Sequence, residues 1–172
     1  VNNAGVATSA PLHKTTTEIW AQTLQINLTA HFILTQRCLP EMVKHGDGRV
    51  VFVASNAGLT GYPYTAAYCA SKHGVVGLMR ALAAEYAQTG VTINAVCPGF
   101  VDTDMTIAAI EKIKSATGRD AVKARRALER MNPQGRLIGV DEVSHAVLSL
   151  IPHAARGING QAIALDGGQV MK

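Results

Sequence analysis

Tyr68 and Lys72 are two side chains that could together take part in acid–base chemistry. They lie four residues apart in a segment with helical periodicity, so one helical turn places both side chains on the same face. A nearby ammonium favours the phenolate form, and it is expected to lower the pKa of Tyr68 toward neutral pH. Tyr68 is therefore a candidate proton donor and acceptor. The alternative is a helix-face tyrosine beside a solvated lysine.

The segments around this pair predict an α/β fold with a parallel sheet. Residues 50–54 are continuously apolar, as in a strand buried on both faces, and residues 68–88 have helical periodicity. Residues 91–96 have the composition of the next strand, which Pro98-Gly99 stops. A strand, a helix and a strand in this order form a βαβ unit, and such units build parallel sheets.

Further elements are expected on both sides of this unit. Residues 1–5 predict the end of a strand entering a tight turn, and residues 17–45 predict a long helix kinked at Pro40. Residues 103–131 predict helices split at Gly118, residues 141–151 a helix capped by Asp141, and residues 161–165 a last strand. We expect one partial domain over residues 1–172, with residues 103–136 as a lid inserted over the site.

Composition and charge argue against several functional classes. The 172 residues are 48% apolar and carry a formal charge of +4, while residues 111–136 alone carry eight basic and three acidic residues. This basic excess lies in one helical segment without interleaved aromatic residues, so we expect no nucleic acid partner. No long apolar run indicates a membrane span or signal peptide, and no cluster of histidines or carboxylates indicates a metal site.

Cysteine usage bears on the compartment of the protein. Cys38, Cys69 and Cys97 are odd in number and lie in apolar segments without the spacing of metal ligands. We expect reduced, buried thiols, as is usual in a cytoplasmic protein.

A series of short motifs resembles the short-chain dehydrogenase/reductase family. In chain order they are Asn2-Asn3-Ala4-Gly5, Asn27, Ser55, Tyr68 with Lys72, Pro98-Gly99 followed by Thr103, and Asp166-Gly167-Gly168. Ser55 stands thirteen residues before Tyr68, as in that family. Each motif alone is weak, whereas all of them in the right order are a strong signal. The segments 71–77 and 94–101 are similar to those of 3-oxoacyl and polyketide ketoreductases.

The resemblance implies an oxidoreductase that transfers a hydride between NAD(P) and a secondary alcohol or ketone. Tyr68 would give the proton, and Ser55 would give a second hydrogen bond to the carbonyl oxygen. Lys72 would hold the ribose hydroxyls of the nicotinamide and keep Tyr68 acidic. Asn27 would hold a water of a proton relay behind Lys72. A core amide that satisfies a helix kink is the alternative for Asn27.

The cofactor implied by the resemblance is NAD or NADP, and no residue of the sequence decides between them. The residues that would line it are Asn3, Gly5, Tyr68, Lys72, Pro98, Gly99, Val101 and Thr103. The chain contains no GxxxGxG turn of the kind that cradles the pyrophosphate in this family. We therefore expect the C-terminal two-thirds of a Rossmann-like, doubly wound parallel sheet whose first strands are missing. The alternative function is a truncated, non-catalytic binding or assembly module of the same fold.

The residues of the lid are expected to contact the substrate. We expect this substrate to be a small ketone, an alcohol or an acyl-CoA, for example a 3-hydroxyacyl or 3-oxoacyl thioester. Its basic side chains would meet the phosphates of coenzyme A, and its apolar ones would cover an acyl chain. They are Lys112, Lys114, Lys123, Arg125, Arg126 and Arg130, and Ile107, Ile110 and Met131. A solvated helix face is the alternative. The family also implies a homo-oligomer, a dimer or tetramer, paired through the two long helices at residues 17–45 and 68–88 and through the C-terminal strand.

Overall fold

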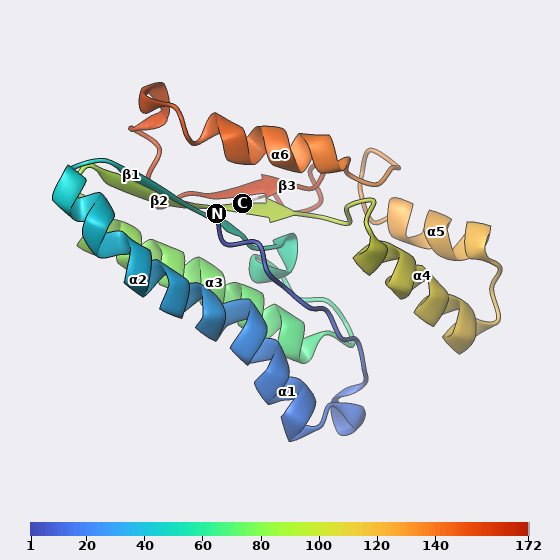
Figure 1. Ribbon diagram of the computed structural model, residues 1–172. Helices are drawn as coiled ribbons and strands as arrows, with labels where there is room; N and C mark the ends of the chain where they lie inside the picture. Colours follow the sequence, from blue (N-terminus) through green and yellow to red (C-terminus); the bar gives the residue numbers. More distant parts are fainter. Residues whose placement is uncertain (172) are drawn as a thin grey trace.

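Three parallel strands lie at the centre of the computed structural model, which describes residues 1–171 (Figure 1). The strands are β1 (Gly48–Val53), β2 (Val91–Pro98) and β3 (Ala162–Leu165), in that spatial order. All eight residues of β2 are buried, as expected for the central strand of a sheet covered on both faces. The predicted α/β class and the Rossmann-like parallel sheet are thus confirmed.

The N-terminus extends this sheet by one position. Asn2 forms a parallel bridge with Phe52. The Asn2 N–H donates to the Val51 carbonyl at 2.8 Å, and the Asn2 carbonyl accepts the Val53 N–H at 2.8 Å. The buried Asn2 side chain also donates to the Thr35 hydroxyl at 3.1 Å. The predicted strand end at residues 1–5 therefore lies beside β1, on the side away from β2.

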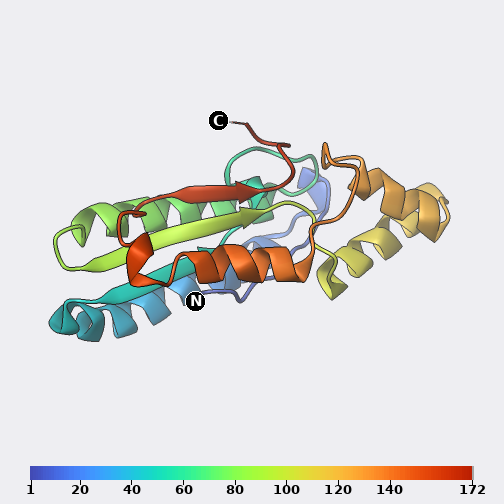
Figure 2. The same cartoon turned by 90° about the horizontal axis from the view of Figure 1, so that it is seen from above.

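Helices cover the two faces of the sheet unequally. One face carries α1 (Thr17–Leu24), the π-helical segment η2 (Gln25–Thr29), α2 (Ala30–His45) and α3 (Ala66–Glu85), and the other carries α6 (Val140–Ser149). Figure 2 shows α6 running lengthwise beside the strands, and Figure 1 shows it on the face opposite α2 and α3. Among residues 1–171, no helix has both the length and the apolar character needed to cross a bilayer.

Successive side chains of each strand point to opposite faces of the sheet, so each strand contributes to the core on both faces. Phe52 and Ile93 pack with Val75 and Met79 of α3 in the larger cluster. Their strand neighbours point to the opposite face, where Val51 packs with Val96, Leu150 and the inner side of α6. Burial on both faces therefore fixes the register of the strands and the placement of the residues that follow them.

The long helix predicted over residues 17–45 is present, with one interruption. It falls at η2, where the chain takes a five-residue π-helical turn, and α2 then continues through Pro40 to His45. A π-helical turn carries one extra residue, and such turns are frequent at functional sites. Here the turn contains Asn27, which is completely buried.

The segment beyond β2 forms a helical hairpin of α4 (Asp104–Thr117) and α5 (Ala121–Glu129). The split at Gly118 is confirmed, because this glycine ends α4 with a positive φ of 67°. The hairpin buries Ile110, Ala124 and Leu128 in a small core of its own. It projects past the carboxyl ends of the strands (Figure 1).

Two local predictions were wrong. Gly139, not Asp141, is the N-cap residue of α6, because the Glu142 carboxylate reaches back to accept the Gly139 N–H at 2.7 Å. This contact starts the helix earlier and closes a capping-box bond. Cys38 is exposed on α2 rather than buried, while Cys69 is half-buried and Cys97 is buried; all three thiols are free.

Candidate active site

The site begins where β1 ends. Ser55 is buried in an extended conformation, and its hydroxyl accepts the Ala57 N–H at 3.1 Å, which caps the short 3-10 helix η3 (Asn56–Gly58). The same hydroxyl donates to the carbonyl of Pro98 at 3.5 Å. Because Pro98 ends β2, this contact holds Ser55 at the carboxyl ends of two neighbouring strands, where α/β proteins commonly bind ligands.

Tyr68 and Lys72 lie in the first two turns of helix α3, which places them near the end of β1. Lys72 is only 4% exposed, and its ammonium donates to the Val53 carbonyl at 3.0 Å and lies 5.8 Å from the centre of the Tyr68 ring. Lys72 forms no ion pair with any residue in the range 1–171. Burial therefore lowers the pKa of Lys72 from 10.5 to about 8.

Burial also dominates the titration of Tyr68. It raises the pKa of the phenol above 10.0, and the interaction with the Ser55 hydroxyl opposes this rise. The expectation that Lys72 lowers the pKa of Tyr68 is thus wrong for the protein as described here. The largest cause is desolvation, which penalises the charged phenolate directly, while the Lys72 ammonium lies 5.8 Å from the centre of the Tyr68 ring.

Asn27 joins the N-terminal turn to α3. Its carboxamide oxygen accepts the Val6 N–H at 2.8 Å, and its nitrogen donates to the Val6 carbonyl at 2.9 Å and to the Ser71 hydroxyl at 3.0 Å. Ser71 in turn donates to the Tyr68 carbonyl at 2.7 Å. The amide that was predicted to be buried in mid-helix therefore has all its close partners within the protein, and it positions the backbone of the Tyr68 helix.

Asn27 belongs to a stripe of buried polar residues that the sequence analysis missed. Thr23, Asn27, His31 and Thr35 recur every four residues and are all buried. Thr35 accepts from Asn2, Asn27 binds Val6, and the His31 ring contacts the Ala4 carbonyl at 2.9 Å. The four-residue spacing of these polar residues, which places them on one helix face, could have revealed them in the sequence. Their hydrogen bonds hold residues 2–6 beside Lys72.

Gly5 lies at the point where this segment approaches the ammonium. A Cβ atom at Gly5 would meet the Asn27 oxygen at 3.5 Å and the Lys72 nitrogen at 3.6 Å. Asn3 is exposed two residues earlier. The structure thus brings Gly5, Asn27, Ser55, Tyr68 and Lys72 to one end of the sheet, with Asn3 on the open side.

The remaining predicted cofactor residues follow β2. Pro98 is tied to Ser55, and Gly99 packs against Asp166, whose Cβ would lie 3.1 Å from a Cβ at Gly99. Val101 bridges to Ile138 in parallel. Thr103 is the N-cap residue of α4, and its hydroxyl donates to the Val101 carbonyl at 3.4 Å. These residues form a connected wall that leads from Ser55 to the helical hairpin.

A second network, which includes Asn56, was not predicted. Asp166 is buried, and its carboxylate accepts the N–H groups of Gly168, Gln169 and Val170 at 3.0 to 3.1 Å. Asn56 donates to Asp166 at 3.3 Å and to the Gln169 side chain at 3.1 Å. The loop after β3 is therefore anchored to the residue next to Ser55.

A cavity of about 370 Å³ opens beside this network. It is lined by Thr60, Gly61, Tyr62, Gln169, Val170 and Met171. Burial, followed by the charge of Asp166, raises the pKa of Tyr62 to about 12, so this phenol is neutral at physiological pH. The cavity offers room for a small organic group next to the loop that carries Ser55.

The lid segment is less open to a ligand than its sequence suggests. Four of its six predicted basic residues have partners: Lys112 donates to the Ser9 carbonyl, Lys114 pairs with Glu111, Lys123 pairs with Asp120, and Arg125 pairs with Asp102 and Glu129. Of these six, only the side chains of Arg126 and Arg130 have neither a hydrogen bond nor an ion pair with any residue from 1 to 171, and both are exposed.

Of the three residues predicted to cover an acyl chain, two are packed in the core of the hairpin and one is exposed. Ile110 is buried in the core of the hairpin, and Met131 packs against that core, so neither is free to cover a ligand. Ile107 is 52% exposed and remains available. The hairpin is stabilised by an apolar core of its own, and Ile110 and Met131 contribute to this core instead of facing a ligand.

Comparisons with known proteins agree with this geometry. The family described as short chain dehydrogenase matches residues 1–114. The chain is 38% identical over 171 residues to D-beta-hydroxybutyrate dehydrogenase of Cupriavidus necator, and 36% identical over 171 residues to a 3-oxoacyl-[acyl-carrier-protein] reductase of Thermotoga maritima. In both cases the alignment spans 99% of this chain, and it covers 66% of the first relative and 65% of the second, slightly less than two thirds of each.

A solved structure gives the same result at the level of the fold. A variant of actinorhodin polyketide ketoreductase, crystallised with NADPH, superposes with a TM-score of 0.92 at 36% identity. The alignment covers 97% of this chain and 65% of the ketoreductase. The ordered motifs, the parallel sheet and the extent of the family match together show that the chain belongs to the short chain dehydrogenase family.

Proposed function

We propose that this chain carries the catalytic half of an NAD(P)-dependent oxidoreductase that interconverts a secondary alcohol and a ketone. The observation that carries the proposal is the convergence of Ser55, Tyr68 and Lys72 at the carboxyl ends of β1 and β2. A phenol, a hydroxyl and an ammonium at one point can donate hydrogen bonds and a proton to an oxygen that gains negative charge.

The residues around Lys72 fit a ligand that carries hydroxyl groups. The ammonium can donate three hydrogen bonds, but it is buried with one acceptor among residues 1–171, the Val53 carbonyl, and without a carboxylate there. The absence of a side chain at Gly5 leaves the backbone turn open toward the Lys72 nitrogen. Lys72 and Gly5 would therefore hold the ribose of a nicotinamide cofactor, with Asn3, Pro98, Gly99, Val101 and Thr103 as the further candidates to line it. The bound cofactor supplies or accepts the hydride.

The protein's own residues then donate a proton and hydrogen bonds to the oxygen of the ketone. Tyr68 stays protonated at neutral pH because its pKa is raised, so it is ready to donate to the oxygen of a ketone. The Ser55 hydroxyl has a single proton, which makes only a long 3.5 Å contact with the Pro98 carbonyl, and turning this proton toward the ketone oxygen would give that oxygen its second hydrogen bond. Asn27 is a positioning residue, since its bonds to Val6 and Ser71 fix the turn and the helix on either side of Lys72.

For the substrate we propose a 3-hydroxyacyl or 3-oxoacyl compound. The names of the relatives support this class, because D-beta-hydroxybutyrate and a 3-oxoacyl group both carry oxygen at the third carbon. Residues 103–136 would act as the lid of the site, with Ile107 facing the acyl group. Arg126 and Arg130 are the free cations that could meet the phosphates of a coenzyme A thioester.

The experiment is a turnover assay with NADH and with NADPH on acetoacetyl-CoA, acetoacetate and a simple ketone. We expect reduction of the 3-oxo compounds, and the doubly substituted variant Arg126→Gln with Arg130→Gln should raise KM for acetoacetyl-CoA and leave KM for acetoacetate unchanged. The charge-matched control is the doubly substituted variant Lys14→Gln with Arg37→Gln, at two exposed positions outside the lid. Absence of turnover together with absence of cofactor binding would favour the non-catalytic alternative.

We also propose that two copies pair through α2 and α3. Phe32, Ile33 and Leu34 are consecutive residues that together expose apolar surface on α2, with exposed fractions of 43%, 37% and 52%. Exposed apolar surface of this kind commonly marks interfaces. The substitution Leu34→Glu is expected to reduce the mass measured by light scattering to that of one chain; an unchanged mass would argue against this surface.

A further inference from the structure

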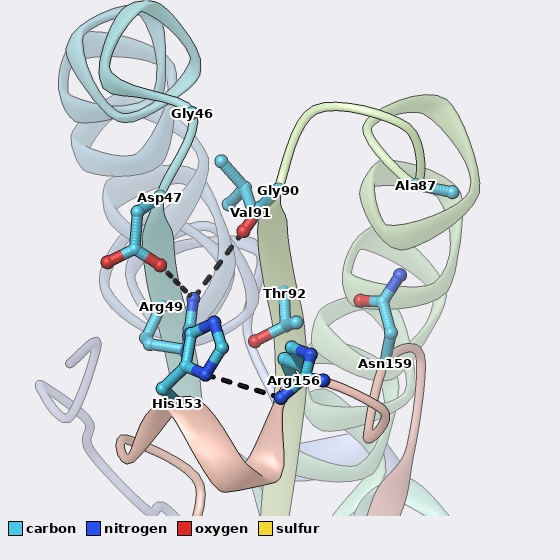
Figure 3. Close-up of a pocket in the computed structure, with 10 residues that line it drawn as sticks. All are labelled: Gly46, Asp47, Arg49, Ala87, Gly90, Val91, Thr92, His153, Arg156 and Asn159. Carbon is cyan, nitrogen blue, oxygen red and sulfur yellow. Dashed lines mark hydrogen bonds and ion pairs between the residues drawn. The ribbon is translucent and has the colours of Figure 1, made fainter.

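A cavity of about 240 Å³ lies at the amino ends of β1 and β2 (Figure 3). Arg49 and Thr92, near the starts of the two strands, are register partners. The third wall comes from the chain after α6, where His153 and Arg156 lie in and just beyond the short 3-10 helix η4 (His153–Ala155). Ser55 lies six residues beyond Arg49, which at strand spacing is about 20 Å away. The cavity is therefore separate from the candidate active site.

The rim of this cavity is built from backbone. Gly90 has a φ of 80°, and a Cβ atom there would lie only 2.0 Å from the Gly46 carbonyl oxygen. The two turns before β1 and β2 therefore touch without intervening side chains. Asn159 fixes the opposite wall, because its side chain accepts the Ile93 N–H at 2.8 Å and donates to the Ala83 carbonyl at 3.1 Å. The cavity is thus held open by fixed contacts.

Arg49 brings a buried donor to the cavity. Its side chain is 9% exposed, and one terminal nitrogen, Nη1, binds the Asp47 carboxylate at 2.7 Å, the Gly48 carbonyl at 2.8 Å and, more weakly, the Gly90 carbonyl at 3.5 Å. The Arg49 Nε atom is buried and has no hydrogen-bond partner. A buried donor of a charged group that is left unpaired is unfavourable, and native proteins rarely leave one without a reason.

The other cation of the cavity is also incompletely paired. Arg156 approaches the His153 Nδ1 atom at 3.2 Å, and within residues 1–171 neither side chain has a carboxylate within ion-pair distance. The Thr92 hydroxyl forms no hydrogen bond with the described part of the chain. Asp47 is the only acidic residue lining the cavity, and its side chain is 71% exposed. Two arginines against one outward-turned aspartate leave a net positive charge.

We propose that this cavity binds a phosphate dianion, either free inorganic phosphate or the phosphate of a small monoester. Arg49 and Arg156 supply charge-assisted donors, and the Thr92 hydroxyl supplies a neutral donor from a second strand. The cavity is smaller than the 300 Å³ or more that is typical of pockets for drug-sized ligands, so a small anion suits it better. Asp47 competes for the Arg49 guanidinium and sets the affinity below what the two arginines alone would give.

The test is a titration of inorganic phosphate, and separately of glycerol 3-phosphate, into the ¹⁵N-labelled protein at constant ionic strength. We expect saturable shifts of the amide signals of Gly90, Thr92 and Arg156. The exposed Arg156 is replaced rather than the nearly buried Arg49, whose loss could unfold the chain. Arg156→Gln should weaken binding about tenfold, and the surface control Arg37→Gln should change it by less than about twofold because exposed charges are screened.

A second variant, Asp47→Asn, tests whether phosphate affinity changes in the expected direction. Asp47→Asn removes the competing carboxylate, so phosphate binding should become tighter. Tighter binding of phosphate than of glycerol 3-phosphate identifies the free ion as the ligand, and the reverse order identifies a monoester. Shifts that do not saturate at constant ionic strength, equal weakening by Arg156→Gln and Arg37→Gln, or weaker binding in Asp47→Asn would overturn the proposal. The readout is binding alone, so it does not depend on catalysis.

Discussion

The buried ammonium of Lys72 makes the stability of the protein depend on pH in a defined window. Its pKa is lowered from 10.5 to about 8, and each pKa unit corresponds to about 1.4 kcal/mol, so burial of the charge costs about 3 kcal/mol at neutral pH. Between pH 8 and 10.5 the unfolded chain binds more protons than the folded one. Stability therefore rises with pH across this window, and the cost is fully present below it.

The substitution Lys72→Met isolates this contribution, because methionine fills similar space without titrating. We expect the free energy of unfolding of the native protein to gain about 2 kcal/mol relative to Lys72→Met between pH 7 and pH 10. The measurement is urea unfolding at several pH values, and groups other than Lys72 contribute nearly equally to both proteins. Lys14→Met, at an exposed position, is the control and should track the native protein.

The loss of the Val53 contact in Lys72→Met shifts its curve by a constant and does not alter the slope. The informative quantity is therefore the difference between the two pH profiles. Parallel profiles of the native protein and Lys72→Met from pH 7 to pH 10 would refute the conclusion that this lysine is a desolvated, unpaired cation.

Two further predictions concern positions that hold the site together. Asn27→Ala removes three buried hydrogen bonds and should destabilise the protein by about 3 kcal/mol in urea unfolding, at about 1 kcal/mol each; Gln25→Ala, exposed in the same π-helical turn, is the control, and equal losses would contradict the role given to Asn27. Gly118→Ala meets open space and should cost only the strain of its positive φ, about 1 kcal/mol. Gly167→Ala would also collide with the Asn132 amide, so about 3 kcal/mol is expected from the strain and two broken hydrogen bonds. Similar losses from both glycine variants would contradict the predicted collision.

Sequence patterns predicted the fold well because burial leaves simple periodicities. The apolar run of β1, the helical stripe of α3 and the stop at Pro98-Gly99 each follow from one local rule. The π-helical turn at residues 25–29 could not be predicted in this way. It depends on Asn27 reaching Val6 and Ser71, and these contacts exist only once the N-terminal segment lies against the sheet.

The same limit explains the errors at the site. The spacing of Tyr68 and Lys72 placed both on one helix face but gave no measure of burial, which raises the pKa of one and lowers that of the other. Asn56 was overlooked because its partner Asp166 lies 110 residues later in the chain. The basic residues of the lid seemed free in the sequence, and only the folded hairpin shows that neighbouring acids and carbonyl groups take four of them.

In the proposed reaction Tyr68 donates the proton to the ketone oxygen. The most direct measurement is the rate of acetoacetyl-CoA reduction, with the preferred nicotinamide cofactor, by the native protein, Tyr68→Phe and the exposed-tyrosine control Tyr64→Phe. Loss of a general acid typically costs about 10²- to 10⁴-fold in rate, so we expect Tyr68→Phe to lose at least about 10²-fold in kcat while Tyr64→Phe keeps native activity. Native turnover in Tyr68→Phe would contradict the assignment.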